Sequence, residues 1–269
     1  MAKQLLIYER ATALSRQRHA DWSVKLNGKY NFARDVNSVP LMVAEFPFAA
    51  SEYAIVFGGQ GDEIIPVALL GVRDNENLQV AEDGGWTGKY VPAFLRRYPF
   101  VFSSNDAGDN FTLCIDEHFD GFNAEGRGER LFDSDGHQTQ YLRSVLGFLQ
   151  AYQVQFQHTK AFTKRLEEFG LLESMQAELT LRSGQKTTLT GFMTVNRERL
   201  KALSADKLAL LMHADELELI YLHLQSLQNF APTAERVGSA PTAPPPSNDM
   251  PSDLAPEPGD ETAGDVPIH

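Results

Sequence analysis

The chain has 269 residues and a formal net charge of −12 at pH 7, and 42% of its residues are hydrophobic, as in ordinary soluble proteins. The acidic balance excludes a nucleic-acid backbone as the main partner, because that partner requires a basic surface. The single cysteine, Cys114, excludes an internal disulfide framework and a cysteine-based zinc site, and it fits a reducing compartment.

No stretch of the chain reaches the ~18 consecutive apolar residues that a membrane-spanning helix requires. The longest apolar run, residues 64–72, has the length of a strand and contains Pro66. Residues 5–8 are too few for the apolar part of a signal peptide. We therefore expect a soluble, cytoplasmic protein without a membrane span.

Charge is distributed unevenly between the two ends of the chain. Residues 1–34 contain seven Lys or Arg against two acidic residues, and they either bind an anionic surface or, as we favour, lie on the acidic body of the protein. Residues 231–269 contain seven acidic residues, one basic residue and nine of the 14 prolines. This last segment has too little apolar surface to offset its ordering entropy, which predicts a disordered acidic tail.

The first half of the chain is rich in strand signals. Residues 24–32 alternate apolar and polar side chains about Asn27-Gly28, the pair that favours a tight hairpin turn. Residues 41–48 are apolar but contain Glu45 and Pro47, which indicates a strand end or an edge strand. The other predicted strands are the runs 54–57, 64–72, 100–102 and 111–115, the last two forming a hairpin. Connections this short leave no room for helical crossovers, so residues 24–116 predict an antiparallel sheet.

Residues 85–100 interrupt this pattern with a dense cluster of aromatic and basic side chains. Pro92 can open a short helix, because the first helical turn has no use for its missing N–H, and Pro99 prevents the helix from continuing. Phe94 and Leu95 would face inward, and Arg96 with its neighbour Arg97 would lie near the helix end.

The second half of the chain is mainly helical. Residues 137–169 lack proline and have apolar side chains at helical spacing, although residues 152–157 also fit a strand and could break the helix near His158. Gly170 is a natural stop. Residues 178–181 and 189–195 predict a hairpin around a Ser-Gly turn. Three later helices are expected, the last ending near residue 229, with these capping residues: Asn196, Ser204 and Asp215.

The predicted fold class is therefore α+β, with an antiparallel β-rich N-terminal part followed by a helical C-terminal part that contains a small β-hairpin. We expect one domain over residues 1–230, β-rich over 24–132 and mainly helical over 137–230. Residues 231–269 are the predicted tail.

Two acidic segments are candidates for metal binding. Asp116, His118 and Asp120 alternate at a strand end and could project together toward iron, manganese or zinc. No spacing identifies a further histidine ligand, so we favour a solvated strand end. Asp133-Ser134-Asp135-Gly136 resembles the start of a calcium loop but lacks the later ligands, and we predict a turn.

The cluster in residues 85–100 supplies the strongest candidate for a binding site. An arginine pair beside aromatic rings suits a carboxylate, a phosphate or the side chains of a protein partner. Alternatively, the rings belong to the core and the arginines cap helix carbonyls or pair with nearby acids. The candidate ligand- or partner-binding residues are Trp86, Tyr90, Arg96, Arg97 and Tyr98. No segment predicts a catalytic residue.

Several segments also share residues with a known family: 37–41, Glu45-Phe46, 53–57, 66–71, 88–100, 114–116, 131–133, 148–149 and 220–224. Through them, roughly residues 10–230 resemble the SapC family of proteobacterial proteins. The resemblance implies an association with a bacterial surface-layer locus, and gene neighbours that include halogenase-like enzymes and TonB-dependent receptors. It implies no catalytic residues, and the lack of a spanning segment separates this chain from the membrane permease of the same name.

We interpret the sequence as that of a non-catalytic binding or accessory protein that serves a cell-envelope or nutrient-uptake pathway. Its partner would be a protein or a small anionic ligand, and no cofactor is implied. One alternative is a metal-dependent enzyme that uses Asp116, His118 and Asp120. Another is a structural component associated with a surface layer.

Overall fold

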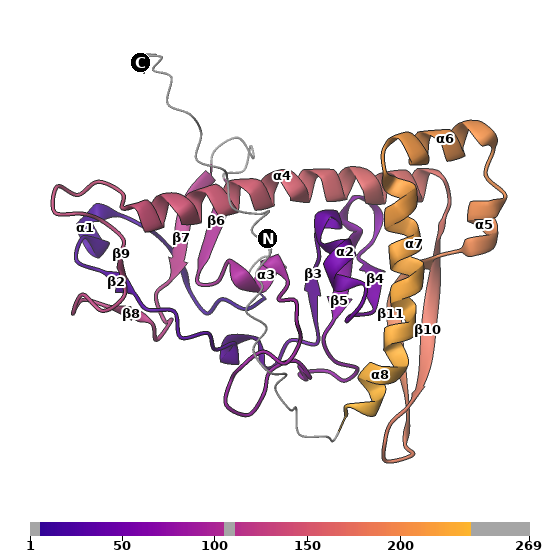
Figure 1. Cartoon of the computed structure of the whole chain (residues 1–269), viewed down its shortest axis with the longest axis horizontal. Coiled ribbons are helices and arrows are strands. Elements are labelled where there is room, and N and C mark those ends of the chain that lie inside the picture. Colours follow the sequence, from indigo (N-terminus) through magenta and orange to yellow (C-terminus); the bar gives the residue numbers. More distant parts are fainter. Residues whose placement is uncertain (1–5, 105–110, 238–269) are drawn as a thin grey trace.

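The computed structural model describes residues 6–104 and 111–237, and it confirms the α+β class, with antiparallel sheets in the first half and the longer helices in the second (Figure 1). Within these two ranges, no helix is long and apolar enough to cross a membrane.

Two three-stranded antiparallel sheets form one end of the molecule. The first has the order β1-β7-β6, from β1 (Ala11–Ala13), β7 (Phe111–Asp116) and β6 (Phe100–Ser104), and it contains the predicted hairpin. The second has the order β8-β2-β9, from β8 (Phe122–Asn123), β2 (Ser23–Val24) and β9 (Glu129–Arg130). Helix α1 (Arg16–His19) lies between β1 and β2 in the chain.

The central sheet combines strands from both halves of the chain. Its order is β10-β11-β4-β5-β3, and its strands are β3 (Ser38–Pro40), β4 (Ile55–Gly58), β5 (Ile65–Leu69), β10 (Leu172–Thr180) and β11 (Lys186–Val195). The C-terminal hairpin is longer than predicted, and Met193 of β11 lies opposite Phe57 of β4. The two halves of the chain therefore share one sheet.

Helix α4 (Gln140–Glu168) packs against both ends of the molecule. Leu142 and Leu149 belong to an apolar cluster with Phe100 of β6, whereas Phe162 belongs to the larger cluster beneath the central sheet, together with Phe57. The helix is unbroken at residue 158, so the competing strand pattern over 152–157 is not followed. The left-handed Gly170, with φ +65°, follows the helix as predicted.

Short helices complete the fold: α2 (Phe46–Ala49), α3 (Ala93–Arg96), α5 (Arg197–Lys201), α6 (Ala205–His213), α7 (Glu216–Ser226) and α8 (Phe230–Glu235). The side chains of Asn196 and Ser204 cap α5 and α6 as predicted. Asp215 instead adopts a left-handed conformation, with φ 56°, and its side chain makes no capping hydrogen bond, so the predicted capping box is wrong.

Residues 231–237, which the sequence analysis assigned to the tail, belong to the folded chain. They include most of α8, and Val237 is buried. Arg236 Nη2 donates hydrogen bonds to the carbonyl oxygen of Leu78 at 2.6 Å and to Thr87 Oγ1 at 2.7 Å. The remainder of the predicted tail, residues 238–269, lies outside the described residues.

Two strand predictions in the first half are wrong. The chain bends at Gly28, which has φ +66°, but β2 pairs with β8 and β9 rather than with the residues that follow the bend. Among those residues, Phe32 stacks on Tyr98 instead. Residues 41–48 form a 3₁₀ turn, Val43–Glu45, followed by α2. Pro47 occupies the first turn of α2, where its missing N–H is tolerated.

A buried histidine joins α7 to the central sheet. His223 Nδ1 donates to the carbonyl oxygen of Ile55 in β4 at 2.9 Å, and Nε2 accepts the backbone N–H of Val195 in β11 at 3.0 Å. Both partners fix the neutral imidazole, because a protonated ring could not accept the second hydrogen bond. Burial lowers the pKa of His223 from 6.5 to about 4.

We predict that His223→Leu lowers the free energy of unfolding by about 2–3 kcal/mol at pH 7, because two buried backbone groups lose their partners. In the wild type, the unfolded chain binds a proton below pH 6.5 and the folded chain does so only below about pH 4. This group therefore costs the fold about 3 kcal/mol of stability as the pH falls through that window. Denaturant unfolding at several pH values measures both effects, and equal pH dependence of the two proteins would contradict the second.

Candidate functional site

The residues 85–100 lead from an irregular loop into α3 and then into β6. Pro92 caps α3, and its carbonyl oxygen accepts the N–H groups of Leu95 and Arg96 at 2.9 and 3.1 Å. The helix has only four residues, Ala93–Arg96, and Pro99 cannot continue it. Successive side chains of so short a helix point in very different directions, and this decides which arginine reaches the surface.

A buried carboxylate, Glu45, holds α3 in place. Its side chain accepts three hydrogen bonds: Oε2 from the N–H of Met42 at 2.8 Å, and Oε1 from the N–H of Ala93 at 2.7 Å and from Tyr90 Oη at 2.8 Å. Burial raises the pKa of Glu45, and these donors partly offset the increase. An ionised carboxylate only accepts, so three donors fit the charged form.

The exposed side of α3 carries a positively charged aromatic patch. The hydroxyl of Tyr90 donates a hydrogen bond to Glu45, and its oxygen accepts one from Arg96 Nη2 at 3.3 Å. The guanidinium carbon of Arg96 lies 5.7 Å from the ring centre of Tyr90 and 5.4 Å from that of Phe148 in α4. Phe48, which is 42% exposed, stacks on Tyr90 with ring centres 5.6 Å apart. We call Phe48, Tyr90, Arg96 and Phe148 the Arg96 surface.

The side chain of Arg96 is exposed, and no carboxylate in the described ranges lies within ion-pairing distance of it. Its Nε donates to the carbonyl oxygen of Val91 at 3.0 Å. The guanidinium is thus oriented by a carbonyl, a hydroxyl and two rings, and its positive charge is directed to solvent.

Trp86 supports this surface from behind. The half-buried indole Nε1 donates to Tyr53 Oη at 3.2 Å and to the carbonyl oxygen of Tyr90 at 3.0 Å. Tyr53 Oη also donates to that carbonyl oxygen. The backbone at Tyr90 is therefore fixed by two side chains from outside the helix.

Arg97 and Tyr98, which the sequence grouped with Arg96, point into the protein. Arg97 is 6% exposed, and its guanidinium carbon lies 4.2 Å from the ring centre of Phe94 and 5.0 Å from that of Tyr152. Tyr98 stacks on Phe32 at 3.9 Å between ring centres. Of the five candidates, Tyr90 and Arg96 form the exposed surface, and the other three support it or belong to the core.

Sequence reasoning missed three contributors: Glu45, Phe48 and Phe148. A signal for the first was present, since an acidic residue within the apolar run 41–48 requires hydrogen-bond partners if it is buried. Phe148 lies on α4 and Phe48 on α2, and no spacing in the sequence connects either with Arg96.

The alternating residues Asp116, His118 and Asp120 do not converge on a common point. Asp116 is fully buried, and its oxygens accept the backbone N–H groups of Glu9 at 2.8 Å and Arg10 at 3.2 Å. His118 and Asp120 are exposed, and His118 Nδ1 lies 3.3 Å from Glu9. The buried carboxylate therefore ties the N-terminal strand to β7, a structural role that leaves its oxygens unsuited to a shared metal.

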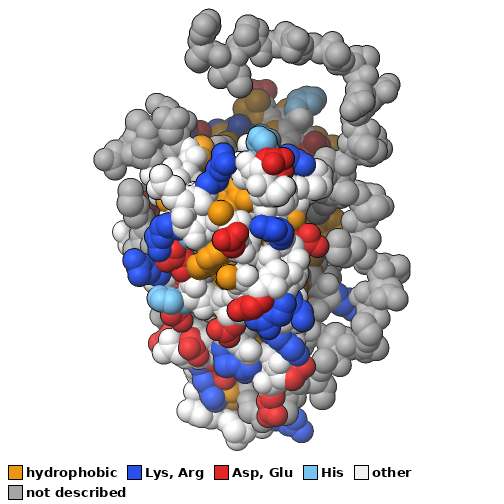
Figure 2. Space-filling model, turned by 90° about the vertical axis from the view of Figure 1, so that its left-hand side faces the viewer, with side chains coloured by type: hydrophobic (Ala, Val, Ile, Leu, Met, Phe, Trp, Pro, Cys, Tyr) orange, Lys and Arg blue, Asp and Glu red, His pale blue; other side chains and the backbone are white. Residues whose placement is uncertain are grey.

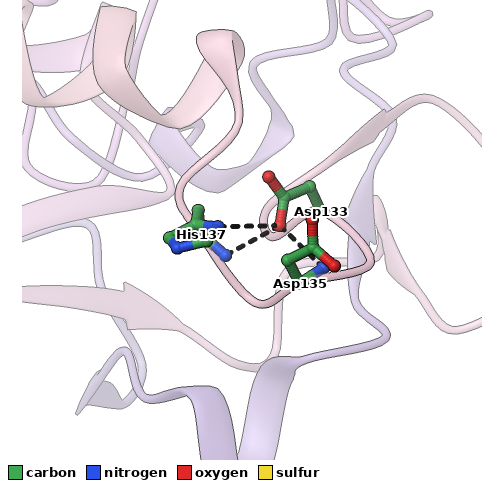
Figure 3. Close-up of side chains that lie close together, drawn as sticks. All are labelled: Asp133, Asp135 and His137. Carbon is green, nitrogen blue, oxygen red and sulfur yellow. Dashed lines mark hydrogen bonds and ion pairs between the residues drawn. The ribbon is translucent and has the colours of Figure 1, made fainter.

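A different acidic group lies at the turn before α4. Among the described residues, the atoms of Asp133, Asp135 and His137 that could bind a metal lie within 4.8 Å of one another (Figure 3). Asp133 Oδ1 already accepts the N–H groups of His137 at 2.7 Å and Asp135 at 3.0 Å, and the first of these is the main reason that its pKa is lowered. This geometry is that of an aspartate-stabilised turn, as the sequence predicted.

The same turn borders a cavity of about 560 Å³, whose wall includes Arg16, Asp21 and Arg130. Figure 2 shows this end of the molecule, where basic and acidic side chains alternate instead of gathering by sign. Because charges of both signs line the cavity, with Arg130 3.9 Å from Asp21, the cavity indicates no particular ligand.

A family model described as SapC matches residues 14–232, a span that contains Glu45, Arg96 and Phe148. No curated protein and no solved structure matches the chain.

We predict that Asp116→Ala lowers the free energy of unfolding by about 3 kcal/mol, because the backbone N–H groups of Glu9, Arg10 and His118 lose a buried acceptor. The matched variant Asp120→Ala removes an exposed carboxylate and should change it by less than about 0.5 kcal/mol. Thermal or denaturant unfolding with and without a chelator measures both. If a chelator destabilised the wild type but neither variant, and the two variants lost similar stability, a shared metal would instead be indicated.

Proposed function

We propose that this chain, which belongs to the SapC family, is a non-catalytic binding protein that recognises its partner through the Arg96 surface. The observation that carries the proposal is the exposed guanidinium of Arg96, oriented between Tyr90 and Phe148 without a carboxylate partner in the described ranges. From its family and composition, we expect the protein to act in the cytoplasm and to serve a cell-envelope or nutrient-uptake pathway.

The chemistry of the Arg96 surface suits recognition. Arginine and tyrosine are enriched among the residues that dominate protein interfaces, where their large side chains are held before binding occurs. Arg96 is restrained by two hydrogen bonds and two rings, so little side-chain entropy remains to be lost when a partner binds. Phe48 adds apolar area next to the charge.

The alternative of a metal-dependent enzyme gains less support. Asp116 is engaged by backbone N–H groups, and Glu45 by two backbone groups and a tyrosine. Both of these buried carboxylates thus have a structural role. A component associated with a surface layer remains compatible with a binding surface, since assembly also requires recognition.

We predict that Arg96→Glu reduces capture of the partner at least tenfold, because an ion pair becomes a repulsion between like charges. The matched control is Arg197→Glu, which makes the same charge change at an exposed position on α5, at the far end of the molecule, and should leave capture unchanged (Figure 1). The measurement is quantitative affinity capture from the native host, followed by binding of the purified partner to each variant.

Arg197→Glu should unfold within about 0.5 kcal/mol of the wild type, because the position is exposed. Arg96→Glu loses two hydrogen bonds and brings a like charge near Glu45, so it should lower the free energy of unfolding by about 1–2 kcal/mol and leave the protein folded. Recovery of no specific partner, or of one captured equally well by Arg96→Glu, would contradict the proposed function.

A further inference from the structure

The guanidinium of Arg96 has one occupied edge and one open edge. Its Nε and Nη2 donate to Val91 and Tyr90, and these two nitrogens form the side edge of the group. The opposite edge pairs one N–H of Nη1 with the second N–H of Nη2. Among the described residues, no acceptor lies within hydrogen-bond distance of Nη1. Two parallel N–H groups match the two oxygens of a carboxylate or of a phosphate.

Glu45 is the positioning residue for this open edge. Because the hydroxyl of Tyr90 donates its hydrogen bond to Glu45, the tyrosine oxygen presents a lone pair to Arg96 Nη2. The buried carboxylate of Glu45 thus fixes the Tyr90 hydroxyl, and the hydroxyl in turn fixes the guanidinium of Arg96 at the surface. The rings of Tyr90 and Phe148 keep the guanidinium from rotating away.

The local charge favours an anion with a single negative charge. Arg97 is directed into the core among aromatic rings and adds no donor to the surface. Glu45 lies one hydroxyl group beneath Arg96 and contributes a negative charge there. Doubling the charge of the ligand doubles both its attraction to Arg96 and its repulsion from Glu45. A doubly charged phosphate also gives up more hydration than a carboxylate, and one arginine above a buried carboxylate offsets less of that loss.

The shape of the site indicates the molecule that carries this anion. Arg96 is exposed, and the exposed ring of Phe48 stacks on Tyr90, whose ring centre lies 5.7 Å from the guanidinium carbon of Arg96. Small ligands are usually bound in enclosed pockets, whereas open faces with one charge and adjacent rings suit polypeptides.

From these observations, and resting on the proposed function, we propose that the Arg96 surface binds an acidic polypeptide segment. An aspartate or glutamate carboxylate of that segment occupies the open edge of Arg96, and a neighbouring apolar side chain packs on Phe48 and Tyr90.

The test uses the full chain and three acetylated, amidated peptides of sequence Gly-Phe-X-Gly-Ser-Gly, in which X is glutamate, glutamine or phosphoserine. Each is titrated while the arginine Nε–H signals are followed by NMR, and Arg96→Lys identifies the signal of Arg96. The glutamate peptide should bind saturably in the millimolar range, at least about fivefold more tightly than either of the others.

Substitutions of Arg96 distinguish recognition by its paired N–H groups from recognition by its positive charge alone. Arg96→Lys keeps the charge but loses the paired N–H groups, and it should weaken binding of the glutamate peptide about fivefold. Arg96→Ala should weaken it more than about tenfold, and the control Arg197→Ala should have no effect. In the two Arg96 variants, binding is followed through the backbone amide signals of residues 90–96.

Equal or tighter binding of the glutamine or phosphoserine peptide would overturn the proposal, as would no saturation by roughly 20 mM. Such a result, together with partner capture that is still lost in Arg96→Glu, would reject the acidic segment while retaining the binding function. If the glutamate peptide showed no preferential binding and Arg96→Glu also captured the partner as well as the wild type does, the proposed function would be rejected too.

Discussion

The buried carboxylate of Glu45 is the interaction on which the candidate site depends. An ionised group in the interior is tolerated only when its oxygens are well hydrogen-bonded, and here the donors come from separate parts of the chain, at Met42, Tyr90 and Ala93. The charge therefore fixes where α3 begins relative to the 3₁₀ turn Val43–Glu45. The position of Arg96 follows from that constraint together with the burial of Phe94 and Leu95 in the core.

The long helix α4 provides the second half of the site through an ordinary packing requirement. Its apolar side chains belong to two separate clusters, so the helix cannot shift along its axis without disturbing both. Phe148 of α4 is thereby held in a fixed position relative to Arg96 of α3.

Local patterns in the sequence were sufficient for most elements but not for the arrangement of the site. The hairpin of β6 and β7, the stop at Gly170 and the caps at Asn196 and Ser204 all depend on neighbouring residues, and all were predicted. The pairing of β2 with β8 and β9 is long-range, so Asn27-Gly28 was misleading. Likewise, adjacency in the sequence grouped Arg96 with Arg97, although one faces solvent and the other is stacked among rings. Only the tertiary position of Glu45 and α4 separates them.

The strand order of the central sheet also determines when this protein can fold during synthesis. One edge of β4 is covered by β11, and His223 of α7 then hydrogen-bonds both strands. Until residue 195 has left the ribosome, that edge of a fully apolar strand has no partner, and such edges pair readily with other chains. The pairing of Phe57 with Met193 spans more than half of the sequence, which makes it a slow step by loop-closure entropy. Residues 55–58 are therefore the segment that a nascent chain must keep from aggregating.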